Sequence, residues 1–136
     1  VAVESSMAAL VVAQRNGKAL GLHVEWRHGR WFEPVRGERF EVVVANPPYV
    51  AAGDPHLADL RFEPASALVS GSDGLAAMRE IIPAARRHLQ RGGWLFVEHG
   101  LRQDPAVRAL MQASGLEEVR TWPDLAGIGR VSGGRA

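Results

Sequence analysis

Residues Phe40–Tyr49 read FEVVVANPPY, an apolar run that leads into a rigid, polar turn. Uninterrupted β-branched residues, here Val42–Val44, are typical of a strand buried on both faces of a parallel sheet. Pro47 and Pro48 end this strand, because neither can donate a ladder hydrogen bond. The stretch therefore predicts an α/β fold with a polar turn at the carboxyl end of a strand, where ligands bind in open α/β sheets.

The turn formed by Asn46, Pro47, Pro48 and Tyr49 has the groups that recognise a planar NH₂ group. Pro47 disfavours the α region for Asn46 and holds its backbone extended. The Asn46 side-chain oxygen and the Pro47 carbonyl can accept two N–H bonds, and Tyr49 can pack against the flat group. Such positioning can contribute about 7–11 kcal/mol, and it requires no general base. An ordinary Asn-Pro turn is the alternative for the dipeptide alone. The four residues together favour a site that aims a weakly nucleophilic nitrogen at an electrophile.

The sequence Asn46-Pro47-Pro48-Tyr49 resembles the signature of S-adenosylmethionine-dependent methyltransferases that act on planar amino nitrogens. Nearly the whole chain is similar to the protein-(glutamine-N5) methyltransferases of bacterial peptide chain release factors. Arg61–Pro64 and the C-terminal stretches Asp124–Gly127 and Gly133–Arg135 also carry this resemblance. It implies a cytoplasmic enzyme of translation termination that methylates a glutamine amide of a release factor, with no direct role for a membrane or nucleic acid. S-adenosylmethionine would be its cofactor.

The resemblance also implies roles for particular residues. Asn46, Pro47 and Tyr49 would be catalytic, and with Pro48 they would bind the substrate amide. Asn46 would also contact the cofactor. Val1–Glu4 looks like the end of a strand, and an acidic residue at the tip of the second strand of a nucleotide-binding fold bonds a ribose hydroxyl. Glu4 occupies the position of this acidic residue.

The resemblance assigns Trp31, in the loop after a strand expected at Val24–His28, to the adenine of the cofactor. The family usually has Asp before this Trp, where the chain has Arg30. An Asp could accept a hydrogen bond from the adenine amino group, whereas Arg has only donors.

A Gly-rich turn before the strand that carries Glu4 is expected in a doubly wound fold, but the sequence has none. Gly127-Ile128-Gly129 precedes a strand and does not qualify. We therefore expect residues 1–136 to be a partial class I methyltransferase catalytic domain. It would be a Rossmann-like, mostly parallel sheet with an antiparallel final strand and without its first strand. Alone, the chain is expected to bind S-adenosylmethionine weakly or not at all and to show no methyltransferase activity.

The remaining elements follow from periodicity and caps. Helices are expected at 7–20, with a cap at Ser5 or Ser6, at 74–91, where Gly92-Gly93 would stop the helix, and at 104–114, capped by Asp104 and ended by Gly115. Strands are expected at 94–100, 117–122 and 130–132, with an irregular segment at 50–72. Glu98 and His99 are given a supporting role only.

The composition is that of one globular domain, with 46% hydrophobic and 23% charged residues among 136. The net charge of +1 argues against strongly electrostatic binding of nucleic acid. The absence of cysteine excludes thiolate metal sites, and His56 beside Asp54 has no second cluster, so no metal is expected. Two alternatives stay open. The turn also fits an amino group of adenine or guanine in DNA or RNA, and the missing glycine turn also fits a non-catalytic module that binds a partner.

Overall fold

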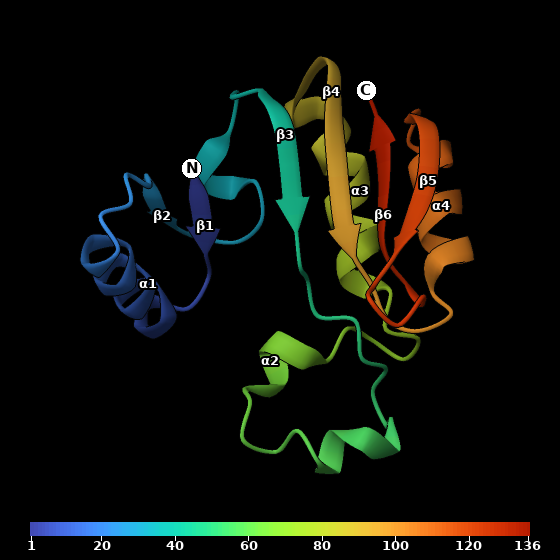
Figure 1. The fold of residues 1–136 in the computed structure, drawn as a ribbon, viewed down its shortest axis with the longest axis horizontal. Helices are drawn as coiled ribbons and strands as arrows, with labels where there is room; N and C mark the ends of the chain where they lie inside the picture. The colour runs from blue at the N-terminus through green and yellow to red at the C-terminus, as the bar shows by residue number, and fades with distance from the viewer. The chain divides into compact units, whose positions relative to one another are not determined.

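The computed structural model describes residues 1–136, which form two compact units, Val1–Glu38 and Arg39–Ala136 (Figure 1). The first unit contains β1 (Ala2–Glu4), α1 (Met7–Ala19), β2 (Trp26–His28) and the short 3₁₀ helix η1 (Glu33–Val35). The second unit contains β3 (Phe40–Ala45), η2 (Pro55–Ala58), α2 (Ala65–Leu68), α3 (Ala76–His88), β4 (Leu89–Glu98), α4 (Asp104–Ala113), β5 (Glu117–Pro123) and β6 (Gly129–Arg135). None of the helices is both long enough and apolar enough to cross a membrane.

In the first unit, β1 and β2 form a parallel pair in which Glu4 lies opposite His28. Helix α1 begins after Ser6, whose hydroxyl accepts a hydrogen bond from the Ala9 amide at 3.3 Å. This is the cap expected from the sequence. The helix packs closely on β2, because a Cβ atom at Gly17 would lie 3.0 Å from the Trp26 ring. The predicted first strand and first helix are therefore confirmed.

Arg27 on β2 fixes the segment that follows this strand. Its guanidinium binds the carboxylates of Glu25 and Glu38 and donates to the Pro34 carbonyl at 2.9 Å. The hydrogen bond to Glu38, followed by the one to Glu25, raises the pKa of Arg27 above its ordinary value. The residues between β2 and Glu38 are thereby tied back to the strand.

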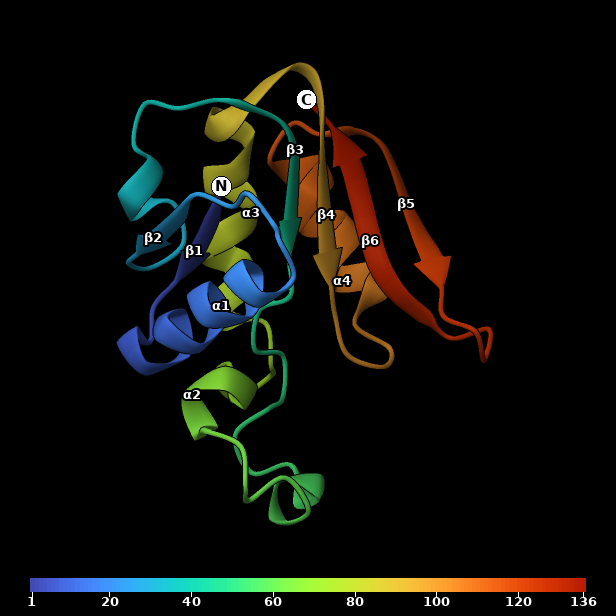
Figure 2. The ribbon, with the colours of Figure 1, turned by 60° about the vertical axis from the view of Figure 1, so that its left-hand side comes forward.

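The second unit contains a four-stranded sheet in the order β3-β4-β6-β5 (Figures 1 and 2). β3 and β4 are parallel, whereas β6 is antiparallel to both β4 and β5. β3, β4 and β5 therefore run in one direction and only β6 is reversed. This confirms the α/β class and the antiparallel final strand. β1 pairs only with β2, and β3 is an edge strand that pairs only with β4.

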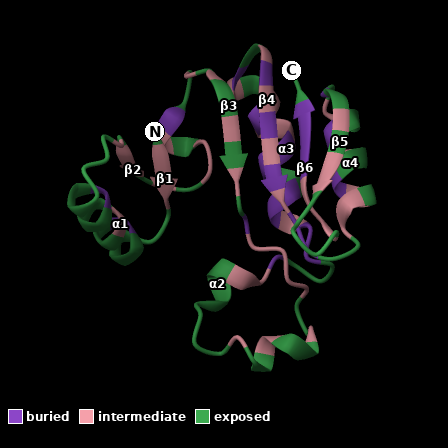
Figure 3. Cartoon of the chain, in the orientation of Figure 1, coloured by how far each residue is buried: buried purple, intermediate pink, exposed green.

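Two helices cover one face of this sheet. α3 contacts β4, α4 contacts β5 and β6, and the two helices contact each other. The core between these helices and the sheet is buried, as the purple segments of Figure 3 show. It includes Met78, Ile82, Leu95, Val107 and Met111. Burial of such side chains contributes about 1.5–3 kcal/mol each relative to an exposed position.

The other face of the sheet corrects one expectation. Val42 and Val44 are 53% and 76% exposed, so the prediction of a strand buried on both faces is wrong. These two valines alternate with Val43 along the strand, and their ladder partners are Trp94 and Phe96. The Arg120 guanidinium carbon of β5 lies 5.5 Å from the Trp94 ring centroid. Trp94 stacks on Phe96 with 5.7 Å between ring centroids.

The end of α3 also differs from the sequence prediction. The helix ends at His88 and β4 begins at Leu89, so the expected helix end near residue 91 and strand start at residue 94 are wrong. Gly92 and Gly93 form an irregularity within β4 and do not stop a helix. A Cβ atom at Gly93 would lie 2.8 Å from the Glu41 carbonyl oxygen. Close approach of two strands therefore explains a glycine that resembled a helix stop.

The two ends of the irregular segment at 50–72 lie side by side and are joined by backbone hydrogen bonds. The Val50 amide donates to the Leu68 carbonyl at 2.8 Å, and the Ser70 amide donates to the Val50 carbonyl at 2.9 Å. η2 and α2 lie between these contacts and form part of the loop drawn below β3 in Figure 1. The segment is thus a closed loop attached to the sheet directly after the turn at Asn46–Tyr49.

Candidate functional site

The turn at Asn46–Tyr49 lies at the carboxyl end of β3, where the sequence predicted it. Asn46 is exposed and its side chain makes no hydrogen bond within the protein, whereas Pro47 is fully buried. Pro48 and Tyr49 are half-buried. The two prolines therefore anchor the turn in the protein and leave the Asn46 amide available to a ligand.

Tyr49 is held by the neighbouring strand. Its hydroxyl donates to Glu98 Oε1 at 3.4 Å, and Glu98 is the last residue of β4. Burial raises the pKa of Tyr49 above its ordinary value, and the Glu98 charge acts in the same direction. The phenol therefore stays protonated at neutral pH. Tyr49 can supply a ring face and a donor, but it cannot act as a general base there.

Sequence reasoning did not find Gln103, which contacts the other end of Tyr49. Gln103 is the N-cap residue of α4, so the expected cap at Asp104 is wrong. Its Nε2 donates to the Tyr49 carbonyl at 3.0 Å, and its Oε1 accepts from the Gly100 amide at 2.8 Å. Gln103 and Tyr49 are 54 residues apart. No local pattern identifies such a contact.

Gly74 lies against the same two groups. It has φ +76°, and a Cβ atom there would lie 2.3 Å from the Tyr49 carbonyl oxygen and 2.6 Å from Gln103 Nε2. Only glycine combines this backbone conformation with this close approach. The loop before α3 therefore packs directly on the turn.

Asp73 fixes that loop to α3. Its Oδ1 accepts hydrogen bonds from the Leu75 amide at 3.1 Å and from Arg79 Nη1 at 3.0 Å. The side-chain bonds from Arg79, followed by the Leu75 amide bond, lower the pKa of Asp73 from 3.8 to about 2. The folded state thus favours the ionised carboxyl. Its stabilising contribution is present above pH 3.8 and is lost as the pH falls toward 2.

Asp73→Asn is expected to reduce the acid sensitivity of the fold. The variant should be less stable than the parent at about pH 6 and should approach the parent at about pH 2, where the Asp73 carboxyl of the parent is protonated in nearly all unfolded molecules and in about half of the folded ones. Urea unfolding at both pH values measures the difference. Asp59→Asn is the matched control, since Asp59 is exposed and its side chain makes no hydrogen bond or ion pair. An equal stability difference at the two pH values would contradict the account.

His99 supports the end of β4 from inside the core. It is fully buried, with Nδ1 3.1 Å from the Gly100 carbonyl oxygen and Nε2 2.9 Å from Ser132 Oγ on β6. A carbonyl can only accept, so Nδ1 carries a proton and donates it to the Gly100 carbonyl. Thr121 Oγ1 lies 2.8 Å from the same Ser132 oxygen. His99 therefore has the supporting role expected of it and does not face a ligand.

In the first unit, Glu4 and the loop with Trp31 lie at the carboxyl ends of adjacent parallel strands. The Gly29 amide donates to the Glu4 carbonyl at 3.0 Å, which places the start of the loop beside Glu4. Glu4 Oε1 accepts from the Ser6 amide at 2.7 Å, and the residue is half-buried. A fixed carboxylate at a strand end is suited to bind hydroxyl groups.

Trp31 has unusual features for a packing residue. Its φ is +50°, and its indole nitrogen is buried without a hydrogen-bond partner. An unpaired buried donor costs about 1–3 kcal/mol. The Arg30 guanidinium carbon lies 5.5 Å from the Trp31 ring centroid and so covers the ring. A flat ligand on this side of the ring would have to displace Arg30.

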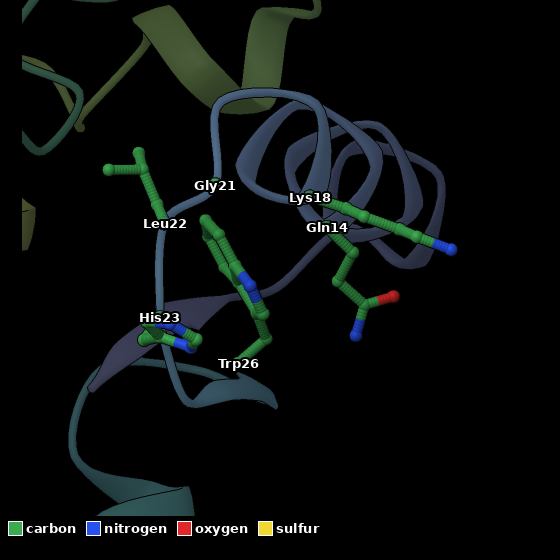
Figure 4. A pocket seen from close by; sticks show the side chains of 6 residues that line it. All are labelled: Gln14, Lys18, Gly21, Leu22, His23 and Trp26. Carbon is green, nitrogen blue, oxygen red and sulfur yellow. The ribbon is translucent and has the colours of Figure 1, made fainter.

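A shallow cavity of about 530 Å³ lies elsewhere in the first unit, beside the C-terminal half of α1 (Figure 4). Its lining residues are Gln14, Lys18, Gly21, Leu22, His23 and Trp26. It includes none of the site residues predicted from the sequence, and it contains no convergent set of catalytic groups.

Comparison with known proteins defines the class. Residues 1–72, more than half of the chain, match the family model described as "Methyltransferase small domain". The chain belongs to this family. A methyltransferase from Pyrococcus furiosus has a similar structure, with a TM-score of 0.73 and 15% identity over 98% of this chain and 60% of the other. For the protein-(glutamine-N5) methyltransferase (release factor-specific) of Alicyclobacillus acidocaldarius, the TM-score is 0.53 and the identity 24%, over 98% and 76% of the two chains. These likenesses confirm the α/β methyltransferase fold.

The curated relatives are more similar in sequence. A release factor glutamine methyltransferase of Xylella fastidiosa (strain Temecula1) is 52% identical over 138 residues, which cover 99% of this chain and 50% of the relative. A protein of the same name from Pseudomonas aeruginosa is 48% identical over 137 residues, with 98% and 50% covered. The chain therefore spans about half the length of the curated relatives it matches.

Proposed function

We propose that this chain supplies the acceptor-binding part of an enzyme that methylates a glutamine side-chain amide of a peptide chain release factor. The observation that carries the proposal is the exposed, unpaired Asn46 amide on a proline-fixed turn at the carboxyl end of β3. The names of relatives that are 40–52% identical support the choice of substrate. A release factor acts in the cytoplasm, which is then the place of the reaction.

The turn binds and orients the amide nitrogen. The Asn46 side-chain oxygen and the Pro47 carbonyl accept its two N–H bonds, and the nitrogen lone pair is thereby directed away from the turn. Pro48 keeps the following backbone rigid, and the ring of Tyr49 packs on the flat amide while Glu98 holds its hydroxyl. The amide nitrogen can lose one of its protons to water after the bond to the methyl carbon forms and the bond from that carbon to the donor breaks, so the turn requires no general base.

S-adenosylmethionine supplies an electrophilic methyl group when it is bound. The residues of the chain fit this cofactor: Glu4 is a fixed carboxylate for the ribose hydroxyls, and Trp31 offers a flat ring with an unpaired indole N–H to the adenine. Arg30 covers the Trp31 ring, so its displacement is part of adenine binding.

The test uses a hybrid enzyme, in which this chain is joined to the remaining half of the Xylella fastidiosa relative. Radiolabelled methyl groups from S-adenosylmethionine are offered to a purified bacterial release factor and, separately, to DNA and RNA oligomers. We expect label in the release factor and none in the oligomers. A folded hybrid enzyme that binds the cofactor in calorimetry and labels only the oligomers would favour an adenine or guanine amino group. A folded hybrid enzyme that binds the cofactor but labels neither the release factor nor the oligomers would favour a non-catalytic module.

A further inference from the structure

We propose that Gln103 is a positioning residue for the acceptor turn, acting through the backbone carbonyl of Tyr49. This inference rests on the proposed function and deepens it. It assigns a residue from the N-terminus of α4 to the placement of the turn that carries Asn46.

The turn has few backbone contacts of its own. The ladder between β3 and β4 ends with Ala45 opposite Val97. Pro47 and Pro48 have no N–H groups, so they cannot continue it. Beyond Ala45 the chain is held by Gln103 at the Tyr49 carbonyl, at 3.0 Å, and then by the Val50 amide bond to Leu68. The Gln103 contact thus holds the exit of the turn directly at the Tyr49 carbonyl.

The Gln103 amide joins three separate segments. Its Oε1 accepts from the Gly100 amide at 2.8 Å, and its Nε2 donates to Tyr49 and lies 3.4 Å from the Asp73 carbonyl oxygen. The Gly100 N–H needs an acceptor and the Tyr49 carbonyl needs a donor. Only one orientation of the amide satisfies both. A carboxylate in the same place could serve Gly100 but would oppose Tyr49.

The space around this amide admits nothing larger. A Cβ atom at Gly74 would lie 2.6 Å from Gln103 Nε2, and one at Gly100 would lie 3.0 Å from Gln103 Oε1 and 3.3 Å from Tyr49 Cδ2. His99 holds the Gly100 carbonyl from the core side. Gln103 is therefore confined on several sides and can transmit the position of β4 and α4 to the turn.

Gln103→Glu tests the proposal, because it keeps the size of the side chain and the bond to Gly100 but places a carboxylate against the Tyr49 carbonyl. In the hybrid enzyme we expect kcat to fall about tenfold, the effect of losing about one hydrogen bond in the transition state. The Kd for S-adenosylmethionine should stay unchanged. The deficit should shrink as the pH is lowered from about 8 to about 5.5, because a protonated Glu regains a donor for Tyr49.

Gln112→Glu is the matched control, since Gln112 lies exposed on the same helix and its side chain makes no hydrogen bond. It should leave kcat and its pH profile as in the parent. A Gln103→Glu enzyme with parental kcat, or with a deficit that does not change with pH, would overturn the positioning role. Activity of the parent hybrid enzyme tests the proposed function separately.

A second measurement needs no activity. Tyr49 is the only tyrosine of the 136 residues, so tyrosine labelled with ¹³C at the carbonyl gives one signal. Gln103→Ala and Gln103→Glu should both shift this signal from its position in the parent chain, and Gln112→Glu should not. Only Gln103→Ala should also speed hydrogen exchange of the Gly100 amide. An unshifted carbonyl signal in both Gln103 variants would contradict the contact itself.

Discussion

Replacement of Asn46 by alanine in the hybrid enzyme is expected to lower kcat by about 10²–10³-fold, which corresponds to about 2.7–4 kcal/mol of lost transition-state stabilisation. The Asn46 side chain is exposed and makes no hydrogen bond within the protein, so its removal leaves no buried group unpaired. The loss should therefore come from the unoriented amide of the substrate. Affinity for S-adenosylmethionine should change less than kcat.

Steady-state kinetics and calorimetric titration of the cofactor separate the two effects. Asn16→Ala is the matched control, because Asn16 is exposed on α1 and the same amide is removed away from the turn. It should leave kcat within about twofold of the parent, as expected for a surface substitution. If Asn46→Ala also stayed within a few-fold, Asn46 would have no part in the reaction.

Gly74→Ala is expected to destabilise the chain by about 2–5 kcal/mol. The left-handed backbone at φ +76° costs about 1–2 kcal/mol for a residue with a Cβ atom. Forcing the Tyr49 carbonyl and Gln103 away from that atom costs about 1–3 kcal/mol more. The hybrid enzyme should also lose activity, because the atom displaced first is the backbone of the acceptor turn, 2.3 Å from the new Cβ.

Gly53→Ala separates these two contributions. Gly53 has φ +90°, but no atom lies within 4 Å of a Cβ built there. It should therefore show only the backbone cost of about 1–2 kcal/mol. Urea unfolding of the 136-residue chain measures both variants. If both substitutions lowered the free energy of unfolding by the same amount, the close contact between residue 74 and Tyr49 would contribute nothing to the destabilisation.

Much of the fold could be predicted from local sequence. The β-branched run before Pro47 predicts β3, and Ser6 and Gly115 mark a helix start and a helix end that the structure confirms. Exposure of Val44 could not be predicted in this way. The exposure of Val44 depends on which elements pack against the strand, and an apolar run has the same sequence pattern whether one face or both faces are covered.

The candidate site likewise contains residues that local sequence could predict and residues that depend on tertiary packing. The residues of the turn are adjacent in sequence, so the pattern of amide, prolines and ring could be recognised at once. Gln103 and Gly74 reach Tyr49 only through the packing of α3 and α4, and neither residue belongs to a local motif. Gly93 was misread for the same reason, because its role is an approach to Glu41 on another strand.

The most direct test of the proposed function is mass spectrometry of a release factor after incubation with the hybrid enzyme and S-adenosylmethionine. We predict one added methyl group on the side chain of a glutamine, and its absence when Asn46 is replaced by alanine. The cofactor affinity of each sample should be measured in parallel, so that a failure to bind the cofactor is recognised. A hybrid enzyme that binds the cofactor but leaves every glutamine of the release factor unmodified would contradict the proposed function.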